Sequence, residues 1–398
     1  PAAWETGKQL AEKLIARYLE EEGKYPETVG IVVWGTSAMR TRGDDVAEIL
    51  ALLGVKPVWQ QESRRVAGLE VIPLAELGRP RVDVTVRISG FFRDAFPNLV
   101  QLINQAVEMV SRLDEPDEQN PLARHVREET AAKVAAGLPE ADARETSMYR
   151  VFGSKPGTYG SGLLPLIESR QWRDEQDLAR VFLTWSGYAY TQEHYGKPAA
   201  AEFQNRLKKV QIATKNQDNR EHDIFDSDDY FQEHGGMVAT IRSLTGKDPK
   251  MYFGDSAHPG HVRMRALSEE AMRVFRTRVV NPKWLASVQR HGYKGALEMA
   301  NTVDFLFGYD ATARIIEDWM YEQLSQKYVL DGAMQDFFRR ANPWAFKDIA
   351  ERLLEAAQRG MWQKPRPETV QALAETLLAA EGWIEEGSME RREKGVRS

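Results

Sequence analysis

The sequence contains no cysteine among its 398 residues. Disulfides, thiolate metal sites and cysteine nucleophiles are therefore excluded. No apolar run approaches the roughly 18 residues of a membrane span, and no N-terminal stretch resembles a secretory signal. We therefore expect a cytoplasmic protein with no membrane span. The chain also lacks an initial Met and begins PAAWETGKQL, so we expect it to be a segment cut from a longer protein.

Signatures of several common enzyme classes are also missing. The loop GTSAMRTRG (35–43) contains neither G-x-G-x-x-G nor G-x-x-x-x-G-K-[ST], so it is interpreted as a tight strand-to-helix connection and the chain is not expected to bind ATP. The absence of a dinucleotide fingerprint and of G-x-S-x-G argues against a dehydrogenase and an α/β hydrolase. A net charge of −6 gives no basic surface for nucleic acid.

What is present indicates a folded α/β protein. Hydrophobic residues make up 42% and aromatic residues 10% of the chain, which is typical of globular proteins. Apolar runs at 29–34 and 82–89 predict buried strands, and helical periodicity predicts helices over 44–53 and 99–110. In the first helix, Asp44 or Asp45 is the expected cap and Gly54 the expected end. Strands that alternate with helices predict a parallel sheet.

The length predicts two or three domains. We expect an α/β domain over residues 1–118, a mixed α/β region with glycine-rich and acidic loops over 119–262, and a mainly α-helical domain over 263–398. Two helices of the last part share one start signal, in which Asn281 or Asn342 caps the helix and the next residue is proline.

Two loops of the α/β part are candidate ligand sites. RISGFFRDAFPN (87–98) begins at the end of a predicted strand, where open α/β sheets bind ligands. Arg87, Arg93 and Asp94 would crowd that rim, although a structural brace is an equally good interpretation. The glycine-rich loop 153–162 surrounds Tyr159 and could let the backbone approach a ligand, but from this stretch alone a mobile surface loop is favoured.

The acidic stretch EHDIFDSDDYFQEHGG (221–236) is a candidate metal site. It is not an EF-hand, because Tyr230 and Phe231 occupy the fifth and sixth positions counted from Asp226. Its mixed nitrogen and oxygen ligands suit Co²⁺, Mn²⁺ or Mg²⁺; they are His222, Asp223, Asp226, Asp228 and Asp229. The alternative, favoured by the residues alone, is that Asp226 or Ser227 caps a helix that carries Tyr230 and Met237.

Several long motifs, in order along the chain, resemble one family. They include VVWGTSAMRTRGDDVAEILALLGVKPVW, ELGRPRVDVTVRISGFFRDAFPNLV, RVFGSKPGTYGSGL, NQDNREHDIFDSDDYFQEHGG and RVVNPKWLASVQRHGYKGALEMANTVDFLFGYDATA. Together they resemble the C-terminal part of the large chelatase subunit, over about residues 25–363. That family includes the cobaltochelatase large subunit and the porphyrin-binding subunit of magnesium chelatase.

The resemblance implies an enzyme that forms nitrogen–metal bonds. HGYKGALEMANTVDFLFGYDATA and LLEAAQRGMW look like the cobalt version. Such a subunit binds a tetrapyrrole, here hydrogenobyrinic acid a,c-diamide of aerobic cobalamin biosynthesis, and inserts Co²⁺ into it. Partner AAA+ subunits hydrolyse the ATP. The alternative within the family is a magnesium chelatase H-type subunit that acts on protoporphyrin IX.

The resemblance also suggests roles for particular residues. His222, Asp226, Asp228 and Asp229 would hold the metal, and His222 and Asp228 would also move protons. The polar edge of the macrocycle would be bound by Arg87, Arg93 and Tyr159.

One departure from the family pattern bears on activity. The upstream H-G-T-x-E segment of full-length members is missing, so we do not expect the chain to catalyse alone. A non-catalytic domain that docks the AAA+ subunits, through the helical half and the charged run MERREKGVRS (389–398), is a second class of function.

Overall fold

The computed structural model describes residues 1–396, with side chains described through residue 389. The chain forms two compact units. Unit 1 comprises residues 1–220 and 232–267, and unit 2 comprises residues 221–231 and the chain from residue 268 onward. The predicted α/β class, with a parallel sheet and a helical C-terminal region, is confirmed. The three domain ranges stay a prediction. The charged run at the C-terminus lies, from residue 390, outside the described side chains.

An eight-stranded sheet forms the middle of unit 1. Its strand order is β10-β9-β8-β1-β4-β5-β6-β7. The pairs from β9 to β5 are parallel, and the strands at both edges are antiparallel. The strands are β1 (Thr28–Val33), β4 (Asp83–Ile88), β5 (Val151–Gly153), β6 (Tyr188–Tyr190), β7 (Tyr195–Pro198), β8 (Ile212–Gln217), β9 (Lys250–Asp255) and β10 (Arg263–Ala266). A separate hairpin pairs β2 (Val55–Trp59) with β3 (Val66–Val71).

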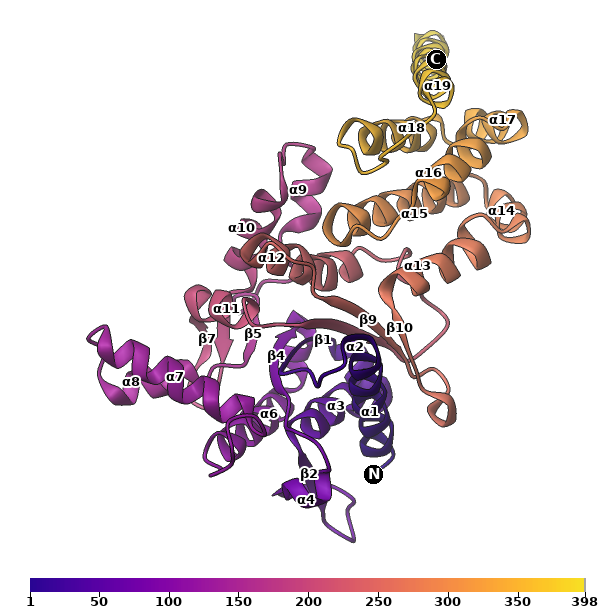
Figure 1. The fold of residues 1–398 in the computed structure, drawn as a ribbon. Coiled ribbons are helices and arrows are strands. Elements are labelled where there is room, and N and C mark those ends of the chain that lie inside the picture. The colour runs from indigo at the N-terminus through magenta and orange to yellow at the C-terminus, as the bar shows by residue number, and fades with distance from the viewer. Residues whose placement is uncertain (397–398) are drawn as a thin grey trace. The chain divides into compact units, whose positions relative to one another are not determined.

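Helices cover both faces of this sheet (Figure 1). One face carries α1 (Ala2–Glu22), α3 (Asp44–Leu53), α6 (Pro97–Ser111) and α7 (Pro121–Ala135). The other carries α10 (Glu175–Ser186), α11 (Ala200–Leu207) and α12 (Gly236–Thr245). Shorter helices are α2 (Gly35–Thr41), α4 (Leu74–Leu77), α5 (Gly90–Ala95), α8 (Glu140–Ser147), α9 (Leu163–Ser169), the π-helix η1 (Tyr230–Gly235) and the 3-10 turn η2 (Pro259–His261).

The two central strands explain where the core lies. Every residue of β1 and of β4 is buried, as expected for parallel strands covered on both faces. Ile31 and Val86 belong to the core that also contains Ile49 of α3 and Ile103 of α6. Each such side chain contributes roughly 1.5–3 kcal/mol of burial free energy. β1 is almost entirely apolar, whereas β4 alternates Val84, Val86 and Ile88 with buried polar residues, and in both strands the apolar residues gave the sequence signal.

Helix ends were predicted with mixed success. Asn281 and Asn342 each accept a backbone N–H in the first turn of their helices, and Gly54 ends α3 in a left-handed conformation with φ 76°, as predicted. Asp44 and Asp45 do not cap α3. The hydroxyl of Thr41 accepts the N–H groups of Gly43 and Asp44 instead. Residues 35–41, predicted as a connecting loop, form α2.

Unit 2 is helical. Its elements are α13 (Leu267–Val274), the π-helices η3 (Phe275–Val279) and η4 (Ser325–Val329), α14 (Pro282–Gln289), α15 (Gly292–Ala313), α16 (Asp318–Leu324), α17 (Gly332–Ala341), α18 (Pro343–Gln358) and α19 (Pro367–Val396). Within the part of the chain described, no helix is long and apolar enough to cross a membrane.

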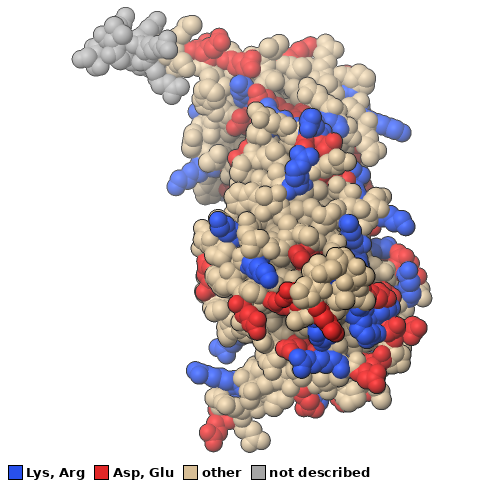
Figure 2. All heavy atoms as spheres, turned by 90° about the vertical axis from the view of Figure 1, so that its left-hand side faces the viewer, with Lys and Arg blue, Asp and Glu red and all other residues tan. Residues whose placement is uncertain are grey.

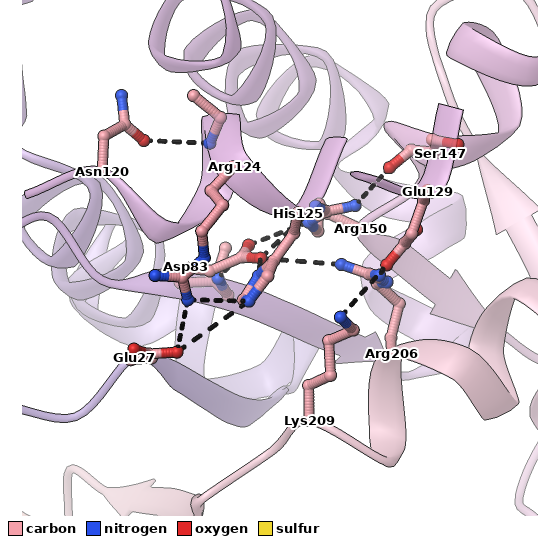
Figure 3. A network of polar contacts seen from close by, with 12 residues as sticks. Glu27, Asp83, Asn120, Arg124, His125, Glu129, Ser147, Arg150, Arg206 and Lys209 are labelled. Carbon is pink, nitrogen blue, oxygen red and sulfur yellow. Dashed lines mark hydrogen bonds and ion pairs between the residues drawn. The ribbon is translucent and has the colours of Figure 1, made fainter. Parts of the chain in front are cut away.

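A buried charge network fixes the first residue of β4 (Figure 3). The carboxylate of Asp83 lies 2.8 Å from Nδ1 of His125 and accepts a 2.8 Å hydrogen bond from Nε of Arg150. Arg206 lies 3.6 Å away and also pairs with Glu129. Although burial alone would raise it, these partners hold the pKa of Asp83 well below its usual range. The network ties β4 to α7 and α11.

Candidate functional site

The candidate site lies at the carboxyl ends of the three central parallel strands. β1 lies between β4 and β8, and its register pairs Val32 with Arg87 on one side and with Lys215 on the other. The two cationic side chains therefore occupy one row across the sheet. After β1, the chain places β4 on one side of β1 and, later in the sequence, β8 on its other side. The order of strands therefore reverses between β1 and β8. Open α/β sheets bind ligands at such a topological switch point.

A carboxylate lies against this row. Glu233 of η1 accepts a 2.5 Å hydrogen bond from the indole N–H of Trp34, the residue that follows β1. Its other oxygen lies 3.3 Å from a guanidinium nitrogen of Arg87. Both charged groups are buried. The pair thus neutralises charge that would otherwise be costly inside the fold.

Lys215 is the second cation of the row. Its ammonium group donates to the backbone oxygen of Asn216 at 2.8 Å and lies 4.0 Å from the centre of the Trp34 ring. Burial lowers the pKa of Lys215, against the opposing effects of Asp45 and Glu233. Lysines of lowered pKa beside carboxylates cluster at functional sites, and Lys215 itself is fully buried.

Both arginines predicted at this rim hold the glycine-rich loop. Arg87 donates to the backbone oxygen of Gly160 at 2.8 Å. The guanidinium of Arg93 donates to the backbone oxygens of Ser154, Lys155 and Thr158 at 3.0–3.2 Å. Arg87 and Arg93 are buried, and in the structure their hydrogen bonds hold the glycine-rich loop in place. Their predicted contact with a macrocycle stays a prediction.

An aromatic rim, formed by Tyr159 and Phe91, lies at the same carboxyl ends of the central strands. Tyr159 is 61% exposed and donates its hydroxyl to Asp94 at 2.6 Å, and Phe91 is 37% exposed. A Cβ on Gly90 would meet the Tyr159 ring at 2.4 Å, and one on Gly35 would meet the Phe91 ring at 2.4 Å. The glycines that follow β4 and β1 therefore let two rings lie directly on the strand ends.

On the face of the sheet that carries α1, α3 and α6, helix α3 contributes a group of buried acidic side chains. Asn216 donates to Asp45 at 2.8 Å and also to Glu48. Burial raises the pKa of Glu48 to about 8 and that of Asp44 to about 7, and it raises the pKa of Asp45 as well. Glu48 therefore carries its proton at neutral pH.

The predicted metal ligands of the acidic stretch, which lie within residues 222–229, belong to unit 2, whereas residues 232–236 of the same stretch belong to unit 1. Asp223 pairs with Arg278 of η3 at 2.5 Å, and Phe225 is fully buried. His222 lies 3.4 Å from Asp226 and its side chain is 64% exposed. Burial and the nearby Asp223 raise the pKa of Asp226.

The structure brings only part of the predicted metal set together. His222 and Asp226 are neighbours, whereas Asp228 and Asp229 do not join them in a group of three converging ligand atoms anywhere in the described chain. The helix that carries Met237 begins with the π-helix η1, which no sequence pattern indicated.

Sequence reasoning missed Trp34, Lys215 and Glu233. Trp34 follows β1, so a rule that favours polar and aromatic residues at strand ends would have selected it. Lys215 lies two residues before the end of β8, a strand that the sequence analysis did not predict. Glu233 gave no such signal, because it was read as part of the acidic stretch. On the face drawn in Figure 2, basic and acidic side chains are interspersed, so no patch of one charge marks a site there.

Comparison with known proteins finds relatives that match nearly the whole chain. A family model described as CobN/Magnesium Chelatase matches residues 1–369. The aerobic cobaltochelatase subunit CobN of Pseudomonas aeruginosa is 51% identical over 365 residues, which are 92% of this chain and 29% of that protein. An uncharacterized protein of Methanocaldococcus jannaschii is 52% identical over 385 residues, 97% of this chain and 31% of that protein.

A solved structure agrees with the fold. The catalytic subunit of cobaltochelatase from Mycobacterium tuberculosis matches with a TM-score of 0.92 and 56% identity, covering 96% of this chain and 32% of that one. The chain therefore spans about a third of the length of these relatives.

Proposed function

Because the chain belongs to the CobN/magnesium chelatase family, we propose that it is the tetrapyrrole-binding part of a large cobaltochelatase subunit. In this proposal the subunit inserts Co²⁺ into hydrogenobyrinic acid a,c-diamide during aerobic cobalamin biosynthesis. Partner AAA+ subunits supply the ATP hydrolysis, and this chain binds no ATP. The observation that carries the proposal is identity of 51% over 365 residues to an aerobic cobaltochelatase subunit.

The aromatic rim is the proposed place of the macrocycle. A corrinoid presents a flat conjugated face surrounded by carboxylate and amide side chains. Tyr159 and Phe91 offer exposed rings at the strand ends, and aromatic faces stack on such ligands. Arg93 lies 5.2 Å from the centre of the Tyr159 ring and pairs with Asp94, the carboxylate that accepts the Tyr159 hydroxyl, so it holds the ring in place. In this arrangement Arg87 and Arg93 act mainly by positioning the glycine-rich loop.

Metal handling is assigned to the acidic stretch. Insertion requires removal of water from the ion and of the N–H proton of the corrin ring, or of two such protons from a porphyrin. Imidazole and carboxylate groups suit both tasks, as transient ligands and as bases. The proposed ligands are His222, Asp226, Asp228 and Asp229, with His222 and Asp228 as the proton acceptors. The exposure of His222 makes it accessible to an incoming ion.

The first test is a titration of the purified chain with hydrogenobyrinic acid a,c-diamide, followed by absorbance and by quenching of tryptophan fluorescence. Protoporphyrin IX is titrated in parallel. We expect a saturable shift with the corrinoid and none with the porphyrin. An absorbance shift with the porphyrin alone would favour a magnesium chelatase H-type subunit over a cobaltochelatase subunit. No shift with either would reject a macrocycle site in this chain and favour a docking role for AAA+ partners.

Variants then locate the site. Tyr159→Ala is expected to weaken corrinoid binding at least tenfold, because it removes a stacking surface of the rim. Tyr293→Ala is the matched control, since Tyr293 is 62% exposed and lies on α15 of unit 2. If both variants bind the corrinoid with equal affinity, the macrocycle does not bind at the aromatic rim. His222→Ala and Asp228→Ala are tested separately by Co²⁺ binding, where unchanged affinity would reject the metal assignment.

A further inference from the structure

We propose that unit 1 carries a second divalent-metal site, formed by Glu145, Glu193 and His194. One ligand atom from each lies within 4.8 Å of the other two, and the described residues contain no other such group of three. The group shares no residue with the rim of strand ends or with the acidic stretch. It does not depend on the proposed function.

Two elements bring the three ligands together. Glu145 lies on α8, and Glu193 and His194 lie in the turn that joins β6 to β7. Nε2 of His194 is 2.6 Å from a carboxylate oxygen of Glu145. The imidazole and the carboxylate therefore already face one another across the two elements.

The turn itself is held in place. The hydroxyl of Thr191 accepts the backbone N–H groups of Glu193 and His194 at 3.2 and 3.0 Å. Gln101 and Asn104 of α6 donate to the backbone oxygens of Thr191 and Tyr190 at 3.1 and 3.0 Å. Because the backbone of the turn is fixed from two sides, less conformational entropy is lost when an ion orders the side chains.

A cavity adjoins the ligands. It has a volume of about 170 Å³, and its lining includes Glu145, Glu193 and Glu108. The cavity gives an ion bound by three protein ligands room for water or a small ligand at its remaining positions, as open metal sites require.

The ligand set indicates which ion would bind. One imidazole nitrogen with two carboxylates suits first-row transition ions such as Co²⁺, Mn²⁺ or Zn²⁺ better than Mg²⁺ or Ca²⁺, which prefer oxygen ligands alone. A second layer of contacts is also present. The hydroxyl of Tyr149 donates to Glu145 at 3.3 Å, and Lys197 lies 5.7 Å from the centre of the Tyr149 ring. Such contacts orient metal ligands.

The test uses the whole chain, freed of metal with a chelator and titrated with Co²⁺ by calorimetry and by visible absorbance. To leave this site alone to be measured, the titration is done in a His222→Ala background. We expect about one equivalent of Co²⁺ to bind, and His194→Ala or Glu193→Gln to weaken binding at least tenfold. Mg²⁺ at the same concentration should not compete.

His258→Ala is the matched control, because His258 is an exposed histidine of unit 1 outside the group. The thermal midpoint of each metal-free variant is compared with that of the parent, which separates loss of a ligand from loss of the fold. The proposal is overturned if no Co²⁺ binds in the His222→Ala background. It is also overturned if His194→Ala, still folded, binds Co²⁺ as tightly as His258→Ala does.

Discussion

The indole nitrogen of Trp34 lies 2.5 Å from a carboxylate oxygen of Glu233, although the two residues are 199 positions apart in the sequence. The bond joins the end of β1 to η1. In Trp34→Phe the ring remains but the buried carboxylate loses one donor, so we expect the free energy of unfolding of unit 1 to fall by about 1–3 kcal/mol. Urea unfolding, compared with Trp344→Phe at a 54% exposed position, measures the difference. Equal losses would mean that the bond contributes nothing to stability.

Asp83 is expected to be the most sensitive residue of the network at the start of β4. Asp83→Asn leaves Arg150 and Arg206 buried beside a neutral amide, and removal of one partner of a buried ion pair costs about 3–5 kcal/mol. Thermal unfolding should show a large fall in Tm. Asp117→Asn, which breaks a pair whose carboxylate is 55% exposed, should cost less than about 1 kcal/mol. A small effect at Asp83 would mean that the arginines find other partners.

Glu48 is expected to destabilise the fold as pH rises. Its pKa is raised by burial to about 8 in the folded chain. An acid whose pKa is raised on folding contributes fully to stability below its unfolded pKa, near 4.3, and loses that contribution as pH rises through the folded value. Glu48→Gln should therefore be the more stable form at pH 8, by on the order of 4 kcal/mol.

That gap should close as the pH approaches 4.5, which a series of urea unfolding curves across pH can follow. A constant difference between Glu48→Gln and the parent at every pH would show that Glu48 does not titrate on folding.

His234 has the opposite pH dependence. Burial lowers its pKa to about 4, and its Nε2 lies 3.0 Å from the backbone oxygen of Ala213. A histidine whose pKa is depressed on folding gives its full contribution above the unfolded value, near 6.5, and loses it as pH falls through the folded one. Between pH 7 and pH 4 we expect a loss of about 3 kcal/mol.

In His234→Gln this part of the acid sensitivity should disappear, because an amide can replace the N–H donor and does not titrate. The exposed His261 gives the control His261→Gln, which should keep the full pH dependence. If both variants respond to acid alike, His234 is not the titrating group.

The sequence predicted features that depend on neighbours along the chain. Apolar runs marked β1 and β4, and the Asn-Pro pairs marked two helix starts, because burial on both faces and a first-turn cap each leave a local pattern. The error at Asp44 has a local cause as well. α3 begins at Asp44, so this aspartate lies within the first turn, and the hydroxyl of Thr41 accepts the N–H of Asp44 itself.

The site depended on contacts that no local pattern records. Arg87 was expected at the rim, but its partner Glu233 is 146 residues away. Likewise, Glu145 and His194 are 49 residues apart and come together only through the fold of α8 against a turn. Sequence spacing can indicate where a strand ends. Which distant side chain contacts the residues at that end depends on the tertiary structure.

The buried charges at the two ends of β4 also bear on how the sheet assembles. In β4 the apolar residues Val84, Val86 and Ile88 alternate with polar residues that are buried as well. Asp83 meets its cationic partners near the start of the strand, and Arg87 meets Glu233 near its end. A strand shifted along its neighbours would enclose ions of one sign without their counterparts. A sheet with β4 in another register would therefore carry an additional free-energy cost, so these ions help to specify the register of the strand.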